Sequence, residues 1–319
     1  MYVVNAASEA VMMDTMRRKR RHVFWIAGAC LVFACSKSPG ASDQAATIGA
    51  KVAQVAAAVT GQDAPLANEF EQGRYLGFDT NKYPGDDTMR AWRTAPSAPY
   101  SWVGYYLSSA CHKDPSWMGK RQKLRDMGWG LAVVYVGQQS WGRAPRKLSP
   151  ASLAALEKKG TTCNADFVSA ARGTADADDA IALVAGEGFA RGTIVFLDVE
   201  RMEQVPTAMR EYYQAWVARV LADGRYEPGI YVHKYNADLI YRDVKPIFVA
   251  AGYDEDPRFW ISSARDFDPS KSPTDVGHAF AGMWQGVIDV MKSVADLPLP
   301  IDINISTWAS PSESGKAAD

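Results

Sequence analysis

The sequence predicts one α/β domain, a (β/α)8 barrel of the TIM type, regular or irregular, that follows an export signal and a tether. Short apolar runs rich in β-branched residues alternate with longer segments of helical periodicity, as in parallel strands joined by crossover helices. Eight such runs fall within about 240 residues, the size of a barrel of this kind. Neither GxGxxG nor GxxxxGK[ST] occurs, whereas an open doubly wound sheet would more often carry such a loop.

The expected elements follow one another from residue 75 onward. We expect strands at residues 75–80, 102–107, 131–138, 193–200, 229–233, 258–262, 282–285 and 300–304. Helices are expected between most of them, at residues 88–94, 120–127, 166–189, 207–221 and 237–249. No internal repeat and no second change in composition follows Glu71. We therefore expect one barrel domain over residues 71–310 and a C-terminal tail at residues 311–319.

The first 35 residues have the features of an export signal. A basic cluster at residues 17–21 precedes 12 apolar residues, 23–34, and then Cys35. This run fits a signal peptide, for which about 7 to 15 apolar residues are typical, and it is shorter than the roughly 20 residues of a permanent span. The paired arginines also permit twin-arginine export. Residues 1–15 look unlike a signal, so translation from Met13 or Met16 is an alternative.

The signal ends in a sequence that resembles the lipobox of bacterial lipoproteins. In residues 31–36, LVFACS, Ala34 precedes Cys35, which would be acylated, although Phe33 is larger than this pattern usually allows. Residues 36–70, rich in Ala and Ser, would tether the domain. We expect a membrane-anchored protein of the cell envelope. Alternatively, the signal is simply cleaved or stays uncleaved, and Cys30 and Cys35 are small apolar residues.

The charge of the exported part argues against a nucleic-acid partner. The chain of 319 residues has 35 basic and 36 acidic residues, and without residues 1–35 it keeps 30 and 34. With no basic surplus, binding to a polyanion has no electrostatic support. No HxH, HExxH or CxxC motif occurs, so no metal and no cofactor are expected. Nothing in the sequence identifies a protein partner.

Four carboxylates are expected at the mouth of the barrel. An apolar strand ends in Asp198 and Glu200, whose side chains point the same way because alternate residues of a strand share a face. The same alternation turns Asp79 inward, and likewise Asp302 and Asn304. Since barrel enzymes keep their active sites at the C-terminal ends of the strands, we expect these groups to meet there.

Such a cluster suits glycoside hydrolysis. One carboxyl group must donate a proton to the leaving oxygen while another stabilises positive charge at the sugar. Crowding of like charges raises at least one pKa and so keeps a proton donor protonated near neutral pH. An isolated D-x-E is more often a solvated strand end; its place after a buried strand leaves the functional interpretation and the solvated strand end equally open.

Six short motifs occur in the order seen in family 25 muramidases. They are Gly77-Phe78-Asp79, Leu197-Asp198-Val199-Glu200, Gly229-Ile230-Tyr231, Phe259-Trp260-Ile261, Trp284-Gln285 and Ile301-Asp302-Ile303-Asn304. The chain more closely resembles their glycoside-hydrolase-like relatives known as domain of unknown function 1906, often exported bacterial proteins. The resemblance implies Glu200 as general acid and Asp198 as the group that orients or stabilises the sugar. Asp79 and Asp302 would complete the acidic cluster.

Further residues are expected to contact the sugar. The resemblance implies that Tyr231 and Trp284 form sugar-facing walls, with Gln285 and Asn304 beside them. His233, two residues beyond Tyr231, should face inward. There it would hydrogen-bond a ligand or be a satisfied polar residue at the rim.

Two features depart from the muramidase pattern. Asp79 is followed by TNKY rather than by Ser-x-Trp, and residues 139–165 form a long insertion after the third strand. The insertion would build substrate subsites or cover the cleft, and Trp141 within it is a weaker candidate for sugar stacking. The leading hypothesis is a glycosidase that cleaves peptidoglycan or a related N-acetylated polysaccharide. A non-catalytic glycan-binding module or an envelope scaffold on the same barrel is the alternative.

The two remaining cysteines are candidates for a disulfide. Cys111 and Cys163 each follow an expected strand on the same face of the barrel, and an oxidising compartment would permit them to pair. The alternative is two separate small apolar side chains. No local histidine arrangement supports a catalytic cysteine, and no GxSxG motif supports a serine hydrolase.

Overall fold

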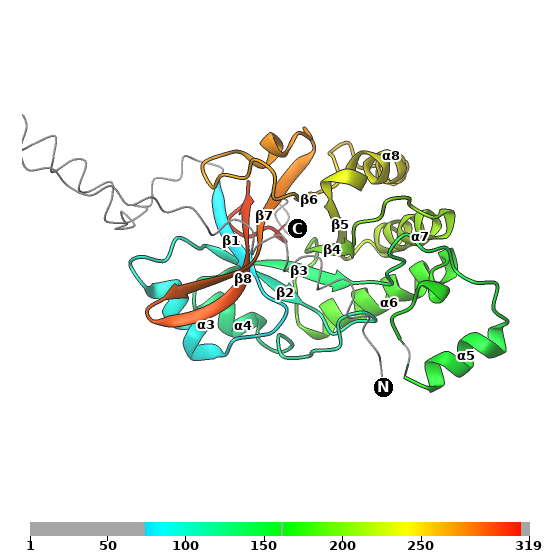
Figure 1. Ribbon diagram of the computed structural model, residues 1–319, viewed down its shortest axis with the longest axis horizontal. Coiled ribbons are helices and arrows are strands. Elements are labelled where there is room, and N and C mark those ends of the chain that lie inside the picture. The colour runs from blue at the N-terminus through cyan, green and yellow to red at the C-terminus, as the bar shows by residue number, and fades with distance from the viewer. Residues whose placement is uncertain (1–73, 161, 314–319) are drawn as a thin grey trace, which may run out of the picture. The chain divides into compact units, whose positions relative to one another are not determined.

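The computed structural model describes residues 74–160 and 162–313 (Figure 1). In this part of the chain eight strands close into a barrel, each bonded to the next in sequence and the last to the first. They are β1 (Tyr75–Asp79), β2 (Trp102–Tyr106), β3 (Gly130–Val136), β4 (Ile194–Val199), β5 (Glu227–His233), β6 (Phe259–Ser262), β7 (Ala281–Val294) and β8 (Leu297–Ser306). The expected eight-stranded α/β barrel is confirmed.

The barrel is irregular in its last strand. Strands β1 to β7 are parallel, but β8 is antiparallel to both β7 and β1. A hairpin turn through Ala295 and Asp296, both at positive φ, joins β7 to β8 without a crossover helix. Between β6 and β7 there is only the short 3-10 helix η2 (Pro273–Val276). The alternation of strand and helix therefore ends at β6.

Each expected helical segment contains a helix in the structure. The helices are α3 (Asp86–Thr94), α4 (Arg121–Asp126), α5 (Pro150–Lys158), α6 (Ala170–Gly186), α7 (Thr207–Asp223) and α8 (Lys234–Ala250), with the 3-10 helix η1 (Ala165–Phe167) before α6. The segment expected at residues 166–189 divides because Asn164 caps η1 and Ser169 caps α6 through their side chains. Helix α5, inside the insertion, was not expected, and none of its residues is buried.

Strand alternation separates two apolar layers. Inside the barrel lie Trp102, Ala132, Val134, Ile194, Phe196, Trp260 and Met283. The outward-facing residues, such as Leu76, Phe78, Ile303 and Ile305, pack in the larger outer cluster with buried residues of the helices. Gly77 makes room for the filling of the barrel, because a Cβ at this position would lie 2.1 Å from the Trp102 ring. The interior is thus packed with side chains.

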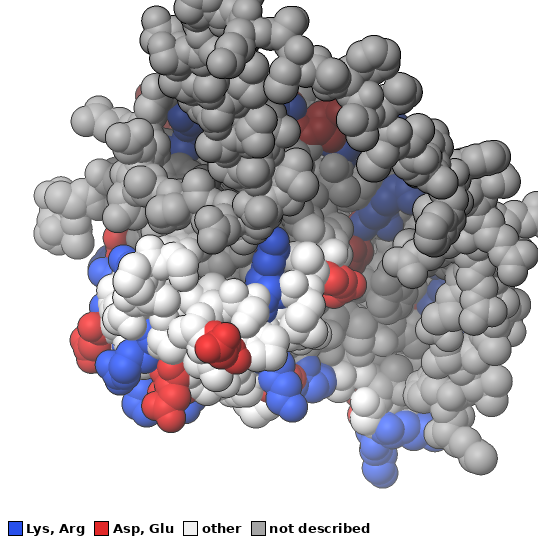
Figure 2. All heavy atoms as spheres, turned by 60° about the vertical axis from the view of Figure 1, so that its left-hand side comes forward, with Lys and Arg blue, Asp and Glu red and all other residues white. Residues whose placement is uncertain are grey.

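The described part of the chain extends past the expected domain boundary at residue 310. The Ser312 side chain accepts a hydrogen bond from Val133 N, and its carbonyl accepts one from Ile194 N. Ser312 therefore contacts β3 and β4. On the face that Figure 2 shows, basic and acidic side chains are interspersed over the visible described residues.

A disulfide joins two of the loops at the C-terminal ends of the parallel strands. Cys111, after β2, pairs with Cys163, at the end of the insertion, with their Cα atoms 4.8 Å apart. The signal region, Cys35 and the tether lie outside the described residues. Among the residues that the structure does describe, no helix is both long and apolar enough to cross a membrane.

Candidate active site

Polar side chains gather around a cavity of about 100 Å³ where the parallel strands end. Its lining consists of Asp79, Tyr106, Val134, Asp198, Glu200, Tyr231, Trp260, Gln285 and Asp302. The structure thus brings together the four expected carboxylates, from β1, from β8 and from the end of β4.

Asp302 reaches this cavity by a different route from the one expected. Because β8 runs in the opposite direction to its neighbours, Asp302 lies within its strand, opposite Asp79 in the pairing with β1. The expectation that every carboxylate stands at the C-terminal end of its strand is wrong for Asp302. An irregularity in β7 turns the Asp289 backbone toward it, and the Asp289 N–H donates to Asp302 Oδ1 at 2.7 Å.

Asp79 is the most fully hydrogen-bonded carboxylate of the site. Tyr106 Oη donates to its Oδ1 at 2.6 Å, while Asn304 Nδ2 and Gln285 Nε2 donate to its Oδ2 at 2.8 and 3.1 Å. Burial raises the pKa of Asp79, and these three hydrogen bonds oppose that rise. The network fixes the orientation of the Asp79 carboxyl group.

Gln285 links the acidic groups to the wall of the cavity. Its Nε2 also donates to Asp302 Oδ2 at 3.0 Å, and its Oε1 accepts from Tyr231 Oη at 2.6 Å. Asn304, completely buried below, accepts at Oδ1 from Trp260 Nε1 at 2.9 Å. One connected network of hydrogen bonds therefore joins β1, β2, β5, β6, β7 and β8.

Asp198 and Glu200 have different environments. Asp198 is buried, and its Oδ1 has no hydrogen-bond partner among the described residues. Burial, together with the charges of Glu200 and Asp79, raises the Asp198 pKa well above its usual value. The Glu200 side chain is open to solvent at the mouth, yet the protein atoms around it still raise its pKa. The site therefore holds a buried unpaired carboxyl group next to an accessible one.

We expect the contribution of Asp302 to the free energy of unfolding to fall as the pH rises from about 4 to 8. Burial and the Asp79 charge raise the pKa of Asp302 to about 7. A carboxyl group whose pKa is higher in the folded than in the unfolded state stabilises the fold while it is protonated, and this contribution is lost as the pH passes the folded pKa. Melting temperatures of the wild type and of Asp302→Asn across this range test the effect. Asp302→Asn should lose less stability, and parallel pH curves would contradict the expectation.

Three of the expected sugar-contact residues do not line the cavity: Asn304 is buried beneath it, and Trp284 and His233 lie elsewhere. Trp284 is completely buried in the outer apolar layer, where its Nε1 donates to Ser263 O at 2.7 Å. The expectation that Trp284 forms a wall of the site is wrong, because neighbouring residues of a strand point to opposite faces and Gln285 faces inward. The indole that lines the cavity is Trp260, from β6.

His233 lies at the end of β5 as the N-cap of α8, where its Nδ1 accepts from Tyr235 N at 3.1 Å. It does not line the cavity. Its position agrees with the second of the two roles considered for it, a satisfied polar residue at the rim.

Tyr106 and Trp260 line the cavity but were not identified as site residues from the sequence. For both residues, the alternation of side chains along the strand could have predicted that they face the cavity. Tyr106 lies two residues beyond Gly104 and four beyond the inward-facing Trp102 on β2, and Trp260 is paired with Tyr231 across the β5–β6 ladder.

Trp141, the weaker candidate for sugar stacking, is 61% exposed at a positive φ within the insertion. Among the described residues, no group of three or more His, Cys, Asp or Glu side chains has the arrangement of a metal site.

Several solved structures are similar to the chain. An uncharacterized protein of B. stearothermophilus is 17% identical with a TM-score of 0.48, and the match covers 73% of this chain and 95% of that one. The spore cortex lytic enzyme SleM of Clostridium perfringens is 14% identical with a TM-score of 0.48, over 74% and 68% of the two chains. The Tat-secreted protein Rv2525c of Mycobacterium tuberculosis, in complex with L-tartrate, is 15% identical with a TM-score of 0.41, over 73% and 95%. No curated protein matches the sequence.

A family model identifies the domain. The model described as Rv2525c-like, glycoside hydrolase-like domain matches residues 90–296, which is more than half of the chain. This match confirms the resemblance to glycoside-hydrolase-like proteins that the sequence motifs indicated. The chain therefore belongs to the family of Rv2525c-like, glycoside hydrolase-like domains.

Proposed function

We propose that the protein is a cell-envelope glycosidase that cleaves peptidoglycan or a related N-acetylated polysaccharide, with Glu200 as the proton donor. The observation that carries the proposal is the convergence of four carboxylates on one cavity in a glycoside hydrolase-like barrel. Glycoside hydrolysis uses such groups to protonate the leaving oxygen and to stabilise positive charge on the sugar ring.

The environments of the carboxylates support distinct roles. Glu200 is accessible from the mouth and has a raised pKa, as a general acid near neutral pH requires. Asp198 precedes it by two residues and has a buried oxygen without a partner. That oxygen is suited to accept a hydrogen bond from an N-acetyl N–H of the substrate, because a buried unpaired acceptor gains most from a new donor. Asp79 and Asp302 would position the network and keep the site acidic.

The test is to incubate the exported chain with purified peptidoglycan and to measure two quantities. The first is the release of new reducing ends, and the second is the amount of protein retained on the insoluble polymer. Release of reducing ends supports the glycosidase. Binding without release would instead support a glycan-binding module on the same barrel. Absence of both would contradict a peptidoglycan substrate.

We further propose that Cys35 carries a lipid that anchors the domain to the envelope membrane. The support is the lipobox-like sequence after the apolar run. Two acyl signals give stable membrane attachment where one chain gives only reversible binding. Growth with labelled palmitate should label the wild type and leave Cys35→Ala unlabelled. An unlabelled wild type would exclude the anchor.

A further inference from the structure

Two consecutive buried glutamines, Gln138 and Gln139, follow β3 and form hydrogen bonds in different directions. Gln139 Nε2 donates to Asp198 O at 2.9 Å, and its Oε1 accepts from Glu200 N at 3.2 Å. We call these two contacts the Gln139 bridge. Pairing of the β3 and β4 backbones ends at Val136 and Asp198. The Gln139 side chain therefore continues, beyond the end of the ladder, the support that a strand neighbour would give to β4.

The Gln139 bridge encloses the part of β4 that carries the two central carboxylates. Its two bonds reach the backbone on either side of Val199, at the carbonyl of Asp198 and at the N–H of Glu200. Gln139 is 3% exposed, so water does not compete freely for these backbone groups. Loss of either bond would leave a shielded polar group without a partner, which favours rearrangement of the strand end.

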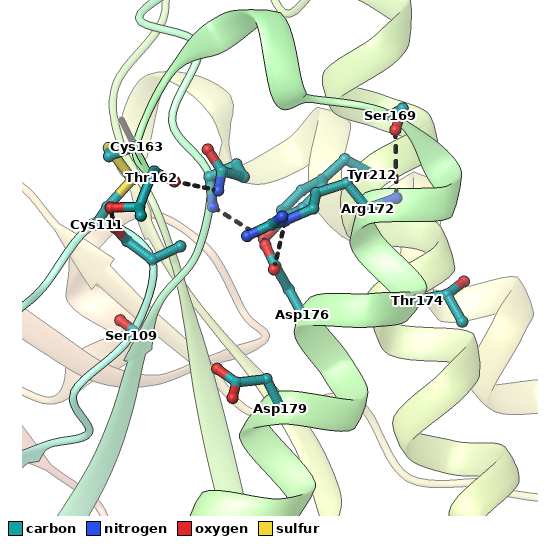
Figure 3. Close-up of polar contacts among 12 residues, drawn as sticks. Ser109, Cys111, Thr162, Cys163, Ser169, Arg172, Thr174, Asp176, Asp179 and Tyr212 are labelled. Carbon is teal, nitrogen blue, oxygen red and sulfur yellow. Dashed lines mark hydrogen bonds and ion pairs between the residues drawn. A yellow bond between two sulfur atoms is a disulfide. The ribbon is translucent and has the colours of Figure 1, made fainter. Parts of the chain in front are cut away.

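Gln138 is fixed from the opposite side. Its backbone N–H donates to Tyr212 Oη at 2.9 Å, and Tyr212 Oη donates to Asp176 Oδ2 at 2.7 Å. Asp176 is paired with Arg172 on the same helix, and Figure 3 shows these three side chains together. Gly137 permits this approach, since a Cβ there would lie 2.3 Å from Tyr212 Oη. The backbone from which Gln139 projects is thus attached to α6 and α7.

The Gln138 side chain binds the end of the insertion and not β4. Its Nε2 donates to Thr162 O at 2.8 Å, and its Oε1 accepts from Asn164 N at 3.1 Å. Between these partners lies Cys163, whose disulfide to Cys111 is visible beside Thr162 in Figure 3. The two glutamines are therefore a natural pair for comparison, with the same side chain, similar burial and two backbone hydrogen bonds each.

We propose that Gln139 is the positioning residue for Glu200: the Gln139 bridge fixes the backbone from Asp198 to Glu200 and so sets the place of the Glu200 carboxyl group above the cavity. This inference rests on the proposed glycosidase function. A proton donor must stand within hydrogen-bond reach of the leaving oxygen. A displacement of about 1 Å in a catalytic site can cost on the order of 10²-fold in rate.

Gln139→Met tests the proposal, with Gln138→Met as its matched control. Both variants of the full chain keep side-chain length and lose two buried hydrogen bonds, but only the first releases β4. We expect Gln139→Met to lower kcat on peptidoglycan by about 10- to 100-fold with KM changed less than about threefold, and Gln138→Met to retain most of kcat. Equal kcat losses in the two variants would overturn the proposal, since they would reflect stability alone.

A milder variant, Gln139→Glu, guards against failure of Gln139→Met to fold. The introduced carboxyl group, while protonated, can donate to Asp198 O and accept from Glu200 N, but once ionised it can no longer donate. We therefore expect kcat near that of the wild type at low pH and an additional fall as the introduced group ionises. A pH profile with the same shape as that of the wild type would count against the Gln139 bridge.

An NMR titration separates this inference from the proposed function. The ¹³C signal of the Glu200 carboxyl group, identified by its disappearance in Glu200→Gln, can be followed in each variant without substrate. Gln139→Met should move the Glu200 titration midpoint, and Gln138→Met should leave it in place. This pattern would support the positioning role even if the wild type released no products, which would refute only the glycosidase. An unmoved midpoint in Gln139→Met would overturn the positioning role even in an active enzyme.

Discussion

Glu200→Gln is expected to lower the rate of peptidoglycan cleavage by about 10²- to 10⁴-fold, the range that general acid catalysis contributes. The amide retains the shape of the carboxyl group but has no acidic proton to give to the leaving oxygen. Glycan binding should change only a few-fold, because Glu200 lies at the open mouth and the hydrogen bonds of Asp79 and Gln285 do not involve it. Initial rates of reducing-end release, measured beside binding to insoluble peptidoglycan, separate the two effects.

Glu203→Gln is the matched control for this experiment. Glu203 is an exposed residue three positions after Glu200 and does not line the cavity. The same chemical change there should leave both cleavage and binding as in the wild type. Comparable losses in the two variants, or near wild-type cleavage by Glu200→Gln, would show that Glu200 is not the proton donor.

Among the substitutions proposed for this protein, removal of the disulfide should have the largest effect on the free energy of unfolding. The Cys111–Cys163 bond closes a loop with a sequence separation of 52 residues. In the loop-entropy model, a bond of this span stabilises the folded state by about 4 kcal/mol. Its loss also frees the segment that binds Gln138. The double variant Cys111→Ser/Cys163→Ser should therefore unfold at a clearly lower denaturant concentration than the oxidised wild type.

Reduction provides the control for the disulfide. Wild type treated with a reductant should unfold with the same midpoint as the double variant, and the reductant should leave the variant unchanged. Equal midpoints for the oxidised wild type and the double variant would contradict a stabilising bond between Cys111 and Cys163.

Strand alternation was the most informative signal in the sequence. On β4 it placed Asp198 and Glu200 on one side of an apolar strand, and on β1 it turned Asp79 inward; the structure has both arrangements. The direction of β8 could not be read in this way, because alternation reports which face a residue occupies and not which way the strand runs. The hairpin before β8 turns through Ala295 and Asp296 rather than through an Asn-Gly pair, so the usual turn signal was absent.

Some side-chain positions were harder to predict. The motif resemblance implies both Trp284 and Gln285 at the site, but adjacent strand residues point to opposite faces, and only Gln285 reaches the cavity. The capping role of His233 depends on where the chain leaves β5 and begins α8. The Gln139 bridge depends on the path of an insertion that has no regular period, so its two partners on β4 could be identified only from coordinates.

Digestion of purified peptidoglycan in H₂¹⁸O, followed by mass spectrometry of the soluble fragments, tests the central proposal most directly. Hydrolysis adds water across the glycosidic bond, so each new reducing end of an N-acetylated sugar should carry one ¹⁸O atom. We expect such fragments from the wild type and almost none from Glu200→Gln. Absence of fragments from the wild type, fragments without the label, or equal release by both proteins would contradict a hydrolase in which Glu200 donates the proton.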